Sequence, residues 1–86
     1  MTPQELCIRR IEEVGTLTDS TVVGLVEGAL DQLEAAYRQP GDRLIALEAV
    51  HSAFTTRRRR TIAVPFGRFV AKVVDQRQNA LINQAA

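Results

Sequence analysis

The 86-residue chain contains no tryptophan, one cysteine and one histidine. A single cysteine, Cys7, excludes an intrachain disulfide framework and any multi-cysteine metal site, which favours a reducing compartment. The sequence also has no glycine-rich phosphate loop, no HExxH motif and no cluster of metal-ligating residue types. We therefore expect no catalytic residues, no metal and no cofactor, and we do not expect an enzyme.

Cys7 and His51 are the two residues with the most reactive side chains, and both fall on apolar stripes of expected helices. Cys7 shares its stripe with Ile11 and Val14, which predicts a buried, inert thiol. His51 lies on the side of Leu47, which predicts an imidazole at the edge of the core.

Long apolar runs are missing as well. No run approaches the length that spans a bilayer, and the N-terminus has neither a basic segment nor an apolar one of the kind found in secretion signals. These absences predict a cytoplasmic protein that does not enter the membrane.

Aromatic residues are few, and the apolar content comes mainly from aliphatic side chains and alanine, which suits helix packing. Eighty-six residues make a single domain, residues 1–86, near the small end of what folds alone. Because so short a chain buries little surface, a homodimer is a reasonable expectation.

Local signals divide the chain into four helices, expected at residues 3–14, 18–38, 42–56 and 64–82. Thr2 and Glu5 flank Pro3 as a capping box, and Gly15 offers a C-terminal stop. Thr18 is the expected N-cap of the second helix, and Asp42 that of the third.

Pro65 indicates a new start near Val64, because the residue before proline is disfavoured in the α region. The polar tail at residues 83–86 is expected to fray. The fold class is therefore all-α: a compact bundle of about four helices, with the second, third and fourth forming the core and the first docked across them.

Gly24 and Gly28 lie in the middle of the second expected helix, with GxxxG spacing. This spacing allows close approach of another backbone, mainly in membranes. We favour the simpler interpretation, that they are surface glycines tolerated at about 1 kcal/mol each relative to alanine.

Charge divides the chain in two. Residues before Thr55 carry nine carboxylates against four arginines, a net of −5, whereas residues from Thr55 onward carry seven lysines or arginines against Asp75 alone, a net of +6. The change coincides with four consecutive arginines, Arg57, Arg58, Arg59 and Arg60, between the third and fourth expected helices.

Three interpretations of this arginine run remain open. Guanidinium groups contact phosphates and would give salt-dependent binding to nucleic acid. The same groups suit an acidic surface on a protein partner or on a second copy of the chain. The third interpretation is a solvated turn that improves solubility. The candidate contact residues are Arg57, Arg58, Arg59, Arg60, Arg68 and Lys72.

An acidic row on the second expected helix is the candidate face for a protein partner. Glu27, Asp31 and Glu34 lie at i, i+4 and i+7, and Glu34 is in register to pair with Arg38.

Two segments resemble a known domain. Arg43-Leu44-Ile45-Ala46-Leu47-Glu48-Ala49, followed after a gap by Arg60-Thr61-Ile62-Ala63-Val64-Pro65-Phe66-Gly67, is similar to the core of an extended-turn helix-turn-helix domain. This domain occurs in activators and antiactivators of conjugative-element transfer. The resemblance implies a helix-turn-helix-like arrangement around residues 42–74 and a regulator that binds DNA or blocks another regulator. Only the basic character of Arg57 to Arg60 carries over from the family.

The sequence thus predicts a small, non-enzymatic regulatory protein that acts on DNA, or on a DNA-associated regulator, through a basic C-terminal half. The alternative is a protein-only interaction module, such as an inhibitor, antiactivator or chaperone-like adaptor, that uses the acidic face and apolar surface.

Overall fold

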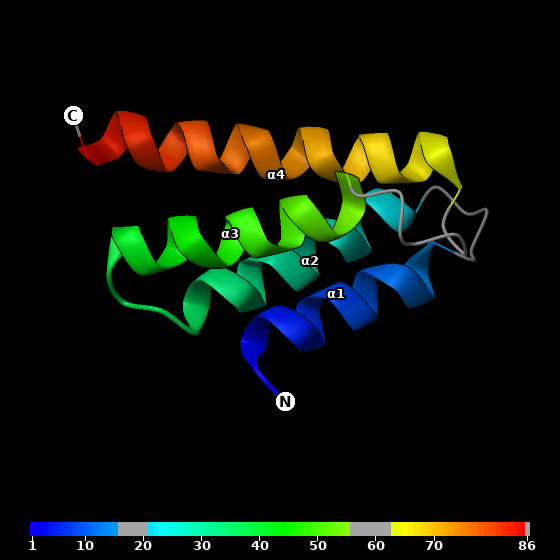
Figure 1. The fold of residues 1–86 in the computed structure, drawn as a ribbon, viewed down its shortest axis with the longest axis horizontal. Coiled ribbons are helices and arrows are strands. Elements are labelled where there is room, and N and C mark those ends of the chain that lie inside the picture. Colours follow the sequence, from blue (N-terminus) through cyan, green and yellow to red (C-terminus); the bar gives the residue numbers. More distant parts are fainter. Residues whose placement is uncertain (16–20, 56–62, 86) are drawn as a thin grey trace.

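The described residues of the protein form four helices. The computed structural model describes residues 1–15, 21–55 and 63–85, with α1 at Pro3–Val14, α2 at Val22–Ala35, α3 at Pro40–Thr55 and α4 at Val64–Ala85. No strand occurs in these residues, so the predicted all-α bundle of four helices is confirmed (Figure 1).

Each helix reverses the direction of the one before it (Figure 1). α3 and α4 lie side by side and form the most extensive helix pair, followed by α1 with α2; among the helix pairs in contact, α2 and α4 touch least. α4 has 22 residues and is therefore about 33 Å long. It extends along most of the longest dimension of the molecule, 36 Å. The helix-turn-helix-like arrangement stays a prediction.

The core draws on all four helices. Cys7 and Ile11 of α1 are buried together with Leu30 of α2, Leu47 of α3 and Val74 of α4. The expectation that α1 merely docks across the other three helices is therefore wrong. α1 packs against both α2 and α3, and its apolar stripe fills space that these two helices leave open.

The start of α1 follows the predicted cap. The Thr2 hydroxyl accepts a hydrogen bond from the backbone N–H of Glu5 at 3.1 Å, and Pro3 is the first helical residue. α1 ends before Gly15, as predicted, but the φ of −63° at Gly15 is right-handed and not the left-handed conformation of a glycine stop. A Cβ on Gly15 would lie 2.7 Å from the ring of Phe66, so any other residue there would force the ring to shift.

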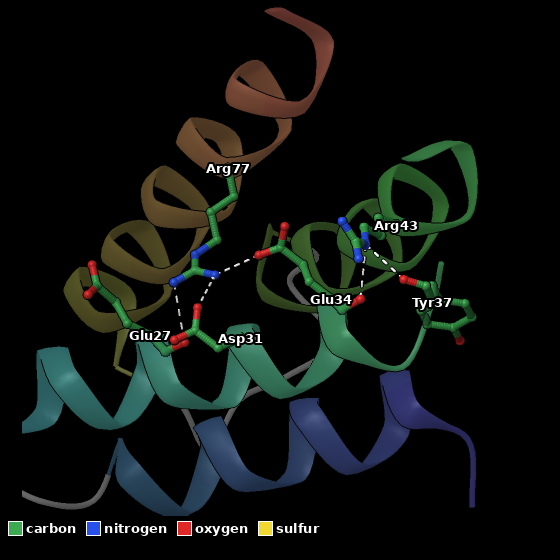
Figure 2. A network of polar contacts seen from close by, with 6 residues as sticks. All are labelled: Glu27, Asp31, Glu34, Tyr37, Arg43 and Arg77. Atoms are coloured by element: carbon green, nitrogen blue, oxygen red, sulfur yellow. Dashed lines mark hydrogen bonds and ion pairs between the residues drawn. The ribbon is translucent and has the colours of Figure 1, made fainter. Parts of the chain in front are cut away.

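The turn between α2 and α3 corrects two expected boundaries. α2 ends at Ala35 rather than at residue 38, and Arg43 caps its end by donating from Nε to the carbonyls of Glu34 and Tyr37, at 3.0 and 2.8 Å (Figure 2). α3 begins at Pro40, because a proline in the first turn forgoes no helical hydrogen bond. Asp42 therefore lies in the first turn and is not the N-cap. The predicted N-cap Thr18 lies outside the described residues, and the structure begins α2 at Val22.

α4 begins at Val64, as predicted, so Pro65 lies in its first turn and starts the helix. The expected fraying after residue 82 is wrong for residues 83–85, which continue the helix. Neither glycine nor proline follows Ile82, so no residue interrupts the backbone hydrogen bonds there. Among the described residues, none of the helices has the length and apolar character needed to cross a membrane.

Candidate binding surfaces

The predicted basic surface is described only at its α4 end. Arg57, Arg58, Arg59 and Arg60 lie outside the described residues. Arg68 and Lys72 are one helical turn apart on α4, and both are exposed. Neither forms a hydrogen bond or ion pair with a described residue.

The row that begins at Arg68 continues along α4 with side chains that carry amides. Successive spacings of four, four, three and four residues place the members on one face of the helix. We call this row the outer stripe; it consists of Arg68, Lys72, Gln76, Asn79 and Asn83. All five residues are exposed, and none has a hydrogen-bond partner among the described residues.

Arg77 belongs to α4 but not to the outer stripe. Its Nη1 lies 2.6 Å from Asp31 Oδ1 and 2.6 Å from Glu34 Oε2, and its Nη2 donates to the Glu27 carbonyl at 3.3 Å. Figure 2 shows the guanidinium reaching from α4 across to α2. Arg77 therefore joins the basic and acidic parts of the chain within one molecule.

The environment of Arg77 favours its charged form. Burial by itself would lower the pKa of the guanidinium, but the hydrogen bonds and negative charges of Asp31 and Glu34 outweigh it and raise the pKa above its ordinary value. Arg77 and Glu34 are each 21% exposed at the side chain, whereas Asp31 is 68% exposed. Glu34 is therefore the partner that most depends on Arg77.

This contact occupies much of the predicted acidic partner face. Asp31 and Glu34 are paired with Arg77, and only the Glu27 carboxylate points away from it (Figure 2). Glu34 does not pair with Arg38 in the structure, because α2 ends before Arg38 and leaves it off the helix. Sequence reasoning gave Arg77 no role, since no local signal links it to a helix more than forty residues earlier.

Charge is distributed unevenly over the four described helices. α4 carries Arg68, Lys72 and Arg77 against Asp75, for a net of +2. In each of the other three helices the carboxylates outnumber the basic residues. The bundle therefore presents a positive edge along α4 and negative or mixed surfaces elsewhere.

A shallow furrow separates α1 from α2. One part, about 450 Å³, is lined by Val14, Leu25, Gly24 and Gly28. A second part begins at Leu6 near the N-terminus. A Cβ added to either glycine would meet nothing within 4 Å, which agrees with the interpretation of these glycines as tolerated surface residues.

Cys7 and His51 lie where the sequence predicted. Cys7 is 3% exposed, and burial raises the pKa of its thiol from 9.0 to about 11, so the inert protonated form persists at neutral pH. His51 is half-buried on α3, at the edge of the core. Among the residues that the structure describes, no three of the histidine, cysteine, aspartate or glutamate side chains are grouped to hold a metal ion.

Comparison of the chain with known protein families, with curated proteins and with solved structures finds no match. The resemblance to transfer regulators therefore stays a prediction.

Proposed function

We propose that this protein is a small non-enzymatic regulator that binds DNA through a basic surface formed by the outer face of α4 and by the arginine run that precedes it in the sequence. The observation that carries the proposal is that the three cations of α4 differ in whether they are paired with a carboxylate of the described residues. Arg77 is half-buried and paired with Asp31 and Glu34, whereas Arg68 and Lys72 are exposed and unpaired among the described residues.

The position of the basic residues supports a phosphate ligand. Among the described helices, only the one that carries Arg68 and Lys72 has a net positive charge, and Arg57 to Arg60 precede that helix by a few residues in the sequence. Guanidinium and ammonium groups on one edge suit the negative charges spaced along a duplex. The net charge of the chain is only +1. Its affinity for DNA would therefore come from the grouping of cations on one surface and not from the total charge.

The test is fluorescence anisotropy with a labelled duplex of random sequence, at several salt concentrations. We expect measurable binding at low salt and a steep loss as salt rises. Two variants test the surface: R57Q/R58Q/R59Q/R60Q, and R68Q/K72Q. If both α4 cations contact phosphates, the second variant lowers the slope of log K against log salt by about 1.8.

A matched control removes two positive charges elsewhere. Arg9 and Arg38 are exposed and lie outside α4. R9Q/R38Q removes the same amount of charge, and it should leave the slope of log K against log salt within about 0.5 of the wild-type value. Absence of binding by the wild-type protein at low salt would overturn the proposal. If the control and the α4 variant have equal effects, binding depends on the total charge of the protein and not on the α4 surface, which would also overturn the proposal.

The furrow between α1 and α2 supports a second candidate function, a protein-only interaction module. Leu6 is 41% exposed and Leu25 is 46% exposed, on opposite walls of the furrow. An amphipathic helix of a partner protein is the kind of ligand that such a groove accepts. Failure of DNA binding, together with co-purification of a protein that L6D and L25D release, would favour this function.

A further inference from the structure

The amide side chains of α4 set this helix apart from a face that is merely solvated. A face that serves solubility is best built from lysine and glutamate, which add charge, and asparagine is a poorer helix former than either. The outer stripe instead continues past its two cations with Gln76, Asn79 and Asn83.

Polar residues on α4 are sorted by what they contact. Arg77 bonds to α2, and Gln78 donates to Glu48 of α3 at 3.0 Å, so both serve the packing of the bundle. Gln76 and Asn79, their neighbours in the sequence, are exposed and have no partner among the described residues. Within the described part of the chain, the stripe amides therefore form no hydrogen bond that holds α4 in place.

An exposed isoleucine borders these amides. Ile82 is 53% exposed and follows Asn79 by three residues, which places it on the adjacent part of the same face. It lies outside the core cluster and outside the apolar residues packed on it. The outward surface of α4 thus combines amides, which both donate and accept hydrogen bonds, with one apolar side chain. It also carries the exposed carboxylate of Asp75, one turn before Asn79.

We propose that the outer stripe reads base edges in the major groove of DNA: Gln76, Asn79 and Asn83 hydrogen-bond to adenine, and Ile82 contacts the thymine methyl group. This inference rests on the proposed function. Glutamine and asparagine form paired hydrogen bonds with adenine N6 and N7, and only thymine among the DNA bases presents a methyl group in that groove.

The dimensions of the stripe fit this partner. The major groove is wide enough to admit an α-helix. Gln76 to Asn83 extends about 10 Å along the helix axis, which corresponds to about three base pairs at 3.4 Å per step. Arg68 and Lys72 lie on the N-terminal side of this segment, where they would contact phosphates and fix the position of the helix without reading sequence.

The experiment begins with the intact protein and a pool of random duplexes. Duplexes that the protein retains are amplified and sequenced through several rounds. Affinities are then measured for an enriched duplex and for a scrambled duplex of the same composition. We expect enrichment of short sites that contain A·T pairs, and a preference of at least tenfold for the enriched duplex.

The variants separate reading of sequence from general affinity. Q76A/N79A/N83A should lose most of the preference, at least fivefold, while its affinity for the scrambled duplex stays within twofold of the wild type. Alanine raises helix propensity at exposed sites, so unfolding cannot account for such a loss. The matched control is Q84A, an exposed amide of α4 that lies off the stripe, and it should keep the preference.

A modified duplex tests Ile82 separately. Replacing thymine with uracil removes only the methyl group, and we expect about fourfold weaker binding by the wild type, the equivalent of one buried methyl. I82A should bind both duplexes equally.

Absence of any enriched sequence would overturn the inference, as would a preference that survives Q76A/N79A/N83A. In either case, salt-dependent binding to the scrambled duplex would leave the proposed function intact. Failure to bind any duplex would overturn both.

Discussion

Replacing Arg77 with methionine removes the charge that joins α4 to α2 while keeping an unbranched side chain of similar length. Asp31 and Glu34 then face each other across the position of the lost guanidinium (Figure 2). The two carboxylates are not equivalent, because Asp31 is 68% exposed and Glu34 is 21% exposed at the side chain.

The expected loss of stability follows from these exposures. The pair with Asp31 resembles a surface ion pair and contributes about 0.5 kcal/mol. The bond to the less exposed Glu34 is charge-assisted, and its loss costs about 1.5–2 kcal/mol. R77M should therefore lower the free energy of unfolding by about 2–2.5 kcal/mol, which for a chain of this size is roughly 10–15 °C in Tm.

Urea denaturation followed by circular dichroism measures the effect, and a double-mutant cycle divides it. R77M is combined in turn with E34Q and with D31N, and the coupling energy should be larger for Glu34. R68M is the matched control: Arg68 is exposed and unpaired among the described residues, so this variant should stay within about 0.5 kcal/mol of the wild type. A coupling to Asp31 that equals or exceeds the coupling to Glu34 would refute the reasoning, as would an R77M variant as stable as R68M.

Three further predictions concern the core, the packing of α1 and the charge on α4. Burial holds the pKa of Cys7 at about 11 against an ordinary 9.0, so its contribution to stability is complete below pH 9 and lost as the pH rises to about 11. The wild type should lose roughly 2–3 kcal/mol more than C7A over that interval in urea titrations, and parallel curves for the two proteins would contradict this expectation. G15A should destabilise the protein by about 1–3 kcal/mol in thermal melts, because the added Cβ would clash with Phe66. G24A has open space around the added Cβ and should stabilise the protein by about 0.5–1 kcal/mol. A G15A variant as stable as G24A would contradict the predicted clash with Phe66. Asp75 is the only carboxylate on the basic helix, so D75N should raise the affinity for the scrambled duplex in anisotropy titrations, and a weaker complex would contradict the predicted repulsion.

Local signals predicted much of the fold. Thr2 and Pro3 set the start of α1, Pro65 set the start of α4, and the apolar stripe of Cys7 and Ile11 identified the buried side of α1. Such signals act within one or two turns of helix, so they can be read from neighbouring residues.

Boundaries and turns were less predictable where a distant residue intervenes. α2 ends at Ala35, and Arg43, eight residues further on, donates to the carbonyls of Glu34 and Tyr37 at this end. Gly15 follows the end of α1, as its sequence signal indicates, but a Cβ there would also meet the ring of Phe66 at the start of α4. Neither contact can be inferred until the helices are packed.

The sequence by itself determined that the chain forms helices, which of their faces are apolar, and that positive charge gathers in the C-terminal half. Only the tertiary structure decided how that charge is divided. Arg77 forms hydrogen bonds with Asp31 and Glu34, which precede it by 46 and 43 residues, and its side chain is half-buried, while Arg68 and Lys72 remain exposed. The physical reason is that helical periodicity fixes the direction of a side chain around its own axis, whereas its partner depends on which helices pack together and in what register.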